Sequence, residues 1–176
     1  MNTLRVNPNH LDGETTPLFI VIRLKGSANM PHDVKRTLSH LRLLRTFSAC
    51  LLRSNPSYVG MLKSAKDVLS WGEIDKASLK ELLARRGRLV GNKRLTEENI
   101  KKVLHFENLD AMVQAIFDGD VQIRDIGDLK PFFRLSPPKG GLKVSKRDRK
   151  FKSHKTRLFV LGHIGGAINE LVSKMS

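Results

Sequence analysis

Residues 18–24 have the sequence LFIVIRL, a run of apolar and β-branched side chains without regular polar alternation. This run predicts a strand, and a strand that is apolar on both faces must be covered on both faces. A chain built around such a strand is constrained to a layered fold in which helices pack against a sheet.

Two helix–strand repeats follow the first strand. Residues 33–44 place apolar side chains on one helical stripe, and residues 47–52 form a second apolar run. Asn55 suits the N-cap of a second helix that has Pro56 at its first position. With a third strand over residues 68–74, this part of the chain predicts a β-α-β-α-β unit.

The second half is predicted to be mostly helical. Helices are expected after Asp75, after Thr96 and after Asn108, and the apolar spacing over residues 168–175 predicts a terminal helix. A basic loop with the sequence RGRLVGNKR spans residues 86–94. Its two glycines and its bases suit contact with a folded RNA backbone.

The segment over residues 135–157, LSPPKGGLKVSKRDRKFKSHKTR, holds nine Lys and Arg side chains and one acid, which is a net charge of +8. Unpaired charges at this density cannot be buried in a core. Pro137-Pro138 stiffen the chain, and Gly140-Gly141 allow close backbone approach to a partner. We expect an extended segment that becomes ordered on contact with phosphates.

The whole chain carries a net charge of +15 over 176 residues, so an acidic partner is expected. Nucleic acid fits better than a membrane surface, because a membrane-binding helix needs several apolar anchors and Phe151 stands almost alone in the basic segment. No apolar run approaches the ~20 residues of a spanning helix, and residues 1–17 lack the pattern of a signal peptide. The expected location is therefore the cytoplasm.

The sequence contains no recognisable catalytic or metal-binding constellation. The six histidines are scattered, and Cys50, the one cysteine, is expected in the core. The stretch GRLVGNK lacks the glycine spacing of a P-loop and the Ser or Thr that would follow Lys93. Trp71 and Tyr58 are too few for a stacking platform, so core packing or hydroxyl anchoring is expected for them. We expect no enzymatic activity, cofactor, metal or small-molecule substrate.

Five stretches taken in order resemble the archaeal form of the L-thirty family of large-subunit ribosomal proteins, whose eukaryotic relative is called L-seven. They are LFIVIRLKG, LRLLR, SYVGMLKSAKDVLSWGEI, RRGRLVGNK and LKPFFRLSPPKGG, and they cover roughly residues 18–142. The resemblance implies three antiparallel strands and two helices, similar to the ferredoxin-like fold, and a structural role in binding ribosomal RNA. Residues 76–176 match the extension of the archaeal and eukaryotic branch. The stretch KTRLFVLGHIGGAINEL departs from the Gly-rich sequence that is usual before the last helix.

The expected fold is therefore α+β: a β-α-β-α-β core with a small three-stranded antiparallel sheet, a mostly helical extension and an extended basic tail. The expected parts are a flexible N-terminal lead (1–17), the core domain (18–75), the helical extension (76–134), the extended basic RNA-binding segment (135–163) and a C-terminal helix (164–176).

The predicted function is that of a structural constituent of the large ribosomal subunit, which stabilises folded ribosomal RNA through phosphate contacts from the basic loop and tail. The expected partners are large-subunit ribosomal RNA, neighbouring large-subunit proteins and the small ribosomal RNA of that subunit. The alternative is a free RNA-binding regulator or RNA chaperone. The residues expected to contact RNA are all basic: Arg42, Arg45, Arg85, Arg86, Arg88, Lys93, Arg94, Arg134, Lys139, Lys143, Lys146, Arg147, Arg149, Lys150, Lys152, Lys155 and Arg157.

Overall fold

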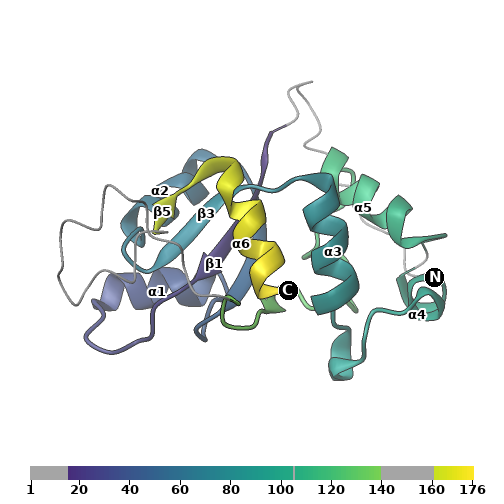
Figure 1. The fold of residues 1–176 in the computed structure, drawn as a ribbon, viewed down its shortest axis with the longest axis horizontal. Helices are drawn as coiled ribbons and strands as arrows, with labels where there is room; N and C mark the ends of the chain where they lie inside the picture. Colours follow the sequence, from purple (N-terminus) through teal and green to yellow (C-terminus); the bar gives the residue numbers. More distant parts are fainter. Residues whose placement is uncertain (1–15, 105, 140–160) are drawn as a thin grey trace.

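A five-stranded sheet with the strand order β4-β2-β1-β3-β5 runs through the computed structural model (Figure 1). The structure describes residues 16–104, 106–139 and 161–176. β1 (Leu18–Arg23) is the central strand and pairs antiparallel with β2 (Ser48–Arg53) and with β3 (Leu69–Glu73). The predicted α+β class and the antiparallel core of three strands are confirmed.

Two short strands extend this core on its outer edges. β4 (Phe133–Arg134) pairs antiparallel with β2, and β5 (Gly162–His163) pairs parallel with β3. The sequence does not predict either strand, because two residues are too few to show a period.

One face of the sheet is covered by the two helices of the core. α1 (His32–His40) contributes Leu38 and α2 (Pro56–Ser64) contributes Leu62 to a buried cluster that includes Val21 of β1. The Asn55 side chain accepts a hydrogen bond from the N–H of Ser57 at 3.0 Å and so caps α2 as predicted.

The opposite face is covered by the extension. Ile20 and Ile22 of β1 lie in a second cluster with buried residues of α3 (Lys76–Arg86), α5 (Leu109–Asp118) and α6 (Ile168–Met175). α4 (Glu97–Leu104) adds Ile100 to this cluster. Both faces of β1 are thus covered, as its apolar run requires. None of the helices in the described part of the chain has the length and apolar content of a membrane span.

α1 ends at His40, four residues before its predicted end. The backbone enters the left-handed region at Arg42 (φ 58°), the Arg42 N–H donates to the carbonyl of Ser39 (2.9 Å), and the Leu43 N–H donates to that of Leu38 (2.8 Å). These bonds form a Schellman cap, with arginine in the position that glycine usually occupies. Leu41, the last apolar residue of the predicted stripe, is buried but is the C-cap, so the apolar spacing continues past the helix and makes the predicted helix too long.

α6 completes the second cluster. Its inward residues are the predicted ones, namely Ile168, Leu171, Val172 and Met175, and all are buried. The helix begins at Ile168 rather than at residue 164, because a 3-10 turn over Gly165–Ala167 precedes it. This turn lies so close to β3 that a Cβ on Gly72 would be 2.1 Å from the carbonyl oxygen of Gly165. Figure 1 shows α6 between the sheet and α3.

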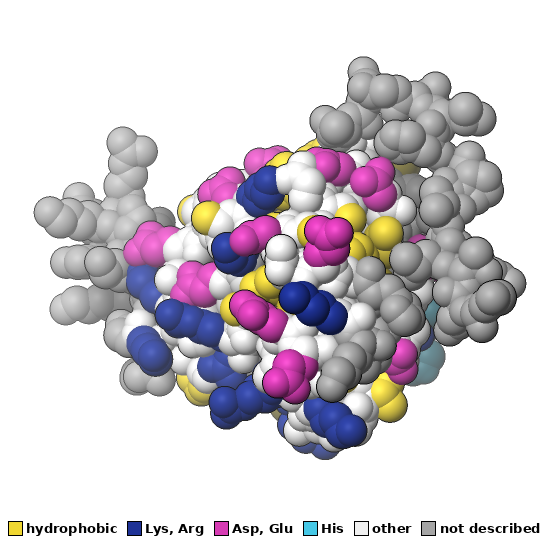
Figure 2. Space-filling model, turned by 90° about the vertical axis from the view of Figure 1, so that its right-hand side faces the viewer, with side chains coloured by type: hydrophobic (Ala, Val, Ile, Leu, Met, Phe, Trp, Pro, Cys, Tyr) yellow, Lys and Arg dark blue, Asp and Glu magenta, His cyan; other side chains and the backbone are white. Residues whose placement is uncertain are grey.

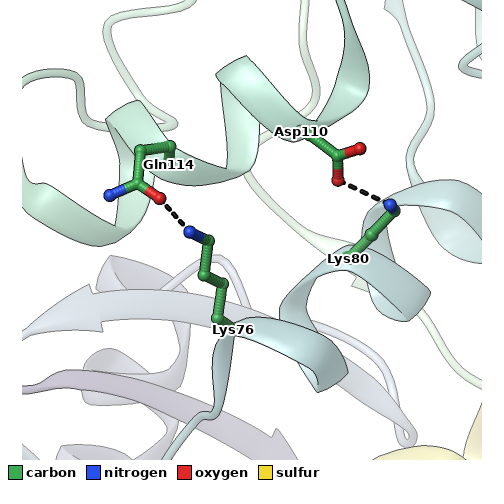
Figure 3. A network of polar contacts seen from close by, with 4 residues as sticks. All are labelled: Lys76, Lys80, Asp110 and Gln114. Atoms are coloured by element: carbon green, nitrogen blue, oxygen red, sulfur yellow. Dashed lines mark hydrogen bonds and ion pairs between the residues drawn. The ribbon is translucent and has the colours of Figure 1, made fainter.

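Side-chain bonds join the helices of the extension. Asn169 of α6 accepts from the N–H of Asp75 through Oδ1 at 3.0 Å, whereas the Asp75 side chain makes no capping bond of its own. Figure 3 shows two links between α3 and α5: the Lys80 ammonium pairs with Asp110 at 2.6 Å, and Lys76 donates to Gln114. Exposed ion pairs of this kind contribute little to stability, so the buried apolar residues of α3 and α5 contribute most of the stability of this packing.

Candidate nucleic-acid interface

A pocket of about 450 Å³ lies where the loop after α3 meets β4. We call it the basic pocket, because its lining comprises Arg86, Arg88, Lys130 and Arg134, together with Asn92 and Phe132. These residues come from separate stretches of the chain, so tertiary structure brings them together.

The predicted basic loop over residues 86–94 begins later than expected, because Arg86 is still part of α3, and residues 88–94 form a folded hairpin. Arg88 and Arg94 form a bridge, and the N–H of Leu89 donates to the carbonyl of Lys93 at 2.9 Å. The turn is made by Gly91 (φ 78°) and Asn92 (φ 63°), both in the left-handed region that glycine and asparagine adopt most readily. Asn92 of this turn is one of the residues that line the basic pocket.

This hairpin is held against residues 128–130. The N–H of Lys130 donates to the carbonyl of Arg88 at 2.9 Å, and the buried side chains of Leu89 and Leu129 anchor the two segments. The backbone of Arg88 and Lys130 is therefore fixed before a partner binds. Such preorganisation lowers the entropic cost of placing the two cations on a ligand.

The other two basic residues of the pocket, Arg86 and Arg134, are positioned by α3 and β4. Arg86 is the last residue of α3, and its guanidinium donates to the hydroxyl of Ser136. Phe133 of β4 is fully buried, whereas its two chain neighbours, Phe132 and Arg134, line the pocket, as side-chain alternation along extended backbone predicts.

The basic pocket carries uncompensated positive charge. None of the ion pairs found among the described residues involves Arg86, Arg88, Lys130 or Arg134. Four cations in one pocket attract an anion, and arginine can offer two parallel N–H donors to a phosphate. Figure 2 shows the side of the molecule that carries α4 and α5, with Lys and Arg densest toward its lower edge and acids spread above.

Arg42 and Arg45 lie on the turn between α1 and β2, and both are exposed. The buried guanidinium of Arg23 holds this turn, because its Nη1 donates to the carbonyls of Leu43 (2.8 Å) and Leu44 (2.9 Å). Burial lowers the pKa of Arg23 from its ordinary value. Arg23 is therefore a basic residue with a structural role: it fixes the turn that carries the exposed side chains of Arg42 and Arg45.

The turn adjoins the basic pocket through β4. The N–H of Leu135 donates to the carbonyl of Phe47 at 2.8 Å, and Ser48 pairs with Arg134. The two basic features thus occupy neighbouring parts of one surface.

Three of the predicted RNA contacts meet in the basic pocket: Arg86, Arg88 and Arg134. Lys93 and Arg94 are exposed on the hairpin. Arg85 is exposed on α3 and pairs with Glu81 at 3.0 Å, and Lys139 is exposed where the described part stops. The remaining predicted contacts lie outside the described residues: Lys143, Lys146, Arg147, Arg149, Lys150, Lys152, Lys155 and Arg157.

Sequence reasoning missed Lys130, Asn92 and Phe132. A partial signal was present, since Lys130 and Arg134 flank the stretch PFF. Only the strand over Phe133–Arg134 shows which of the two phenylalanines is buried and which lines the pocket.

Both ends of the predicted basic segment (135–163) are attached to the core. At its start, the N–H of Ser136 donates to the carbonyl of Met175 (2.9 Å), and that of Lys139 donates to the carbonyl of Lys174 (3.1 Å). At its end, Gly162–His163 form β5, which pairs with β3. Residues 140–160, between these two attachments, lie outside the described part of the chain.

The residues considered for other chemistry have structural roles. Trp71 is buried, and the Tyr58 hydroxyl accepts from Arg124 at 3.1 Å, as expected for core packing and hydroxyl anchoring. Burial raises the pKa of the Cys50 thiol to about 12, and Arg124 opposes this shift in part. Among the described residues, no group of His, Cys, Asp and Glu could hold a metal ion.

Comparison with known proteins gives a consistent result. Residues 19–69 match the family described as "Ribosomal protein L30p/L7e". The "Large ribosomal subunit protein uL30" of Thermofilum pendens is 40% identical over 159 residues, which cover 90% of this chain and 98% of that relative. Proteins of the same name from Archaeoglobus fulgidus and Methanocorpusculum labreanum are 38% and 37% identical over 158 residues, which cover 90% of this chain and 99% of each relative.

Proposed function

The chain is an archaeal-type member of the L30p/L7e family of ribosomal proteins, and on that premise we propose that it is a structural constituent of the large ribosomal subunit that binds and stabilises folded ribosomal RNA. Relatives that align over nearly their whole length are named as proteins of that subunit, which supports the structural role. The same membership supports a component of the cytoplasmic ribosome rather than an enzyme, with neighbouring subunit proteins and the small ribosomal RNA of the large subunit as further partners.

The observation that carries the RNA-binding part is the basic pocket. Its four cations lie on preorganised backbone and face no carboxylate in an ion pair among the described residues. Phosphate contacts from such a site release counterions and fix the protein on the RNA without reading base sequence. Lys93 and Arg94 on the hairpin, Arg85 on α3, Lys139 and the eight bases of the 140–160 segment are proposed to extend this interface.

Neutralising the basic pocket tests the proposal. The variant combines Arg86→Gln, Arg88→Gln, Lys130→Gln and Arg134→Gln, and filter binding measures its affinity for transcribed large-subunit ribosomal RNA over a salt series. We expect weaker binding and a salt slope that is shallower by about 0.7–0.9 for each phosphate that the variant no longer neutralises. Footprinting on the same RNA locates the site.

A matched control removes the same charge from exposed residues that do not line the basic pocket. Lys35→Gln, Arg36→Gln, Lys63→Gln and Lys66→Gln change exposed residues of α1, α2 and the turn after α2. This variant is expected to retain most of the affinity and the footprint. Equal losses in the two variants would show that net charge, and not the pocket, determines binding.

Sedimentation separates the ribosomal role from that of a free regulator. The protein is expected to stay with the large subunit on sucrose gradients at moderate and at high salt. Release into the light fractions at moderate salt would favour the regulator.

A further inference from the structure

Among the residues whose side chains the structure describes, Leu44 is the most exposed large hydrophobic one, at 68%. It lies in the turn over residues 41–47, between Arg42 and Arg45, which are also exposed. A single exposed leucine is common on protein surfaces. What distinguishes Leu44 is the backbone that presents it.

The turn is fixed by the buried guanidinium of Arg23. Arg23 is only 3% exposed, and its guanidinium donates to the carbonyls of Leu43 and Leu44, to that of Lys25 (2.9 Å) and to the Ser27 hydroxyl (2.7 Å). Burying an arginine is costly unless its donors are used, and here they hold the carbonyl of Leu44 itself.

The turn is also strained at both ends. Arg42 (φ 58°) and Phe47 (φ 61°) adopt left-handed backbone that residues other than glycine rarely take. The N–H of Phe47 donates to the carbonyl of Arg23 at 2.7 Å, which holds the second of these residues in place. Backbone of this kind persists where surrounding structure over-determines it, often at sites of function.

The charge of the turn indicates what kind of partner it meets. Residues 41–47 contain two arginines and no acid, and neither arginine takes part in an ion pair found among the described residues. Because Ser48 pairs with Arg134, the turn continues the surface of the basic pocket. An anionic partner with apolar faces, held by the same surface, fits these properties.

We propose that Leu44 packs on the exposed face of a ribose or an unstacked base of ribosomal RNA, while Arg42 and Arg45 bind the phosphates beside it. The inference rests on the proposed function and adds an apolar contact to it. RNA exposes riboses in its wide minor groove and base faces where bases are unstacked, and leucine is among the apolar side chains that DNA-binding proteins insert between base steps.

Substitutions at Leu44 separate this apolar packing from charge. Leu44→Ser is expected to weaken binding to transcribed large-subunit ribosomal RNA about ten-fold at every salt concentration, with the salt slope unchanged, because an apolar contact releases no counterions. Leu44→Met keeps an apolar side chain and is expected to bind like the wild type. Thr46→Ala, at an exposed position of the same turn, is the control for general sensitivity.

The arginines are expected to behave in the opposite way. Arg42→Gln and Arg45→Gln should each flatten the salt slope by about 0.7–0.9 if each binds one phosphate. Thermal unfolding of all the variants is expected to match that of the wild type, since the substituted side chains are exposed.

Three outcomes would overturn the inference. In the first, Leu44→Ser binds RNA like the wild type while the basic-pocket variant does not; the proposed function then stands and the role of Leu44 is wrong. In the second, Leu44→Ser keeps its RNA affinity but is missing from purified large subunits, so Leu44 faces a neighbouring protein. In the third, the wild type binds this RNA no better than a mixed-sequence duplex, and both proposals fall.

Discussion

Cys50 shows at the residue scale how environment decides chemistry. It lies in β2, buried with Leu38 and Trp71 in the cluster under α1 and α2. Because its thiol has a pKa of about 12, almost no thiolate forms near neutral pH, and the thiolate is the reactive species. The prediction that Cys50 is a core residue and not a nucleophile is consistent with this burial.

The same shift predicts a pH-dependent loss of stability. The thiol ionises in the unfolded chain near the ordinary pKa of 9.0 and in the fold near a pKa of about 12. The contribution of Cys50 to the free energy of unfolding is therefore fully present below about pH 9. It falls as the pH rises toward 12, by up to about 1.4 kcal/mol per pH unit. Urea unfolding of the wild type and Cys50→Ala, from about pH 8 to about pH 11, measures it, because other titrations cancel in the difference. A difference that stays constant with pH would contradict the prediction.

At the scale of elements, α6 is part of the core and not an appendage. Ile168→Ala is expected to lower the free energy of unfolding by about 2–5 kcal/mol, because it leaves a cavity in the buried cluster that α6 completes. Ser173→Ala, at an exposed position of the same helix, should stay within about 0.5 kcal/mol of the wild type. Urea denaturation of both variants checks this, and equal small effects would mean that α6 is not packed.

Elements with a strong local period could be predicted from the sequence. Leu79, Leu82 and Leu83 of α3 face inward as their spacing indicates, and α2 begins at Pro56 as expected. The basic pocket could be predicted only in part, because it depends on pairing between distant residues. The hairpin is fixed by the bridge between Leu89 and Leu129, and no local pattern reports such a pairing.

At the scale of the whole molecule, the part of the predicted basic segment over residues 140–160 is preceded and followed in the chain by packed residues. Residues 136–139 are bonded to the end of α6, and β5 is paired with β3. Deleting residues 136–176 would therefore remove part of the core together with the segment. The contribution of the segment to RNA binding is better measured by replacing its Lys and Arg residues with neutral ones.

The same arrangement predicts that the protein survives a cut in the segment. A specific protease site in place of residues 146–150 is expected to give two fragments that co-elute on size exclusion in native buffer and separate in denaturant. Buried contacts of α6 with α3 and the sheet hold them together. With Ile168→Ala and Val172→Ala added, the cut fragments should separate without denaturant. Separation of the fragments in the otherwise unchanged protein would refute this prediction.

The position of α6 after the basic segment also has a consequence in time. β1 is synthesised early and α6 late. The buried cluster that contains Ile20 and Ile22 is therefore incomplete until residues 168–175 have been synthesised. A chain whose synthesis stops before this point presents apolar surface, which chaperones and proteases act on. The core is therefore complete only in a chain that has been translated through Met175. A chain that ends earlier keeps apolar surface exposed and is expected to be degraded before it assembles into a subunit.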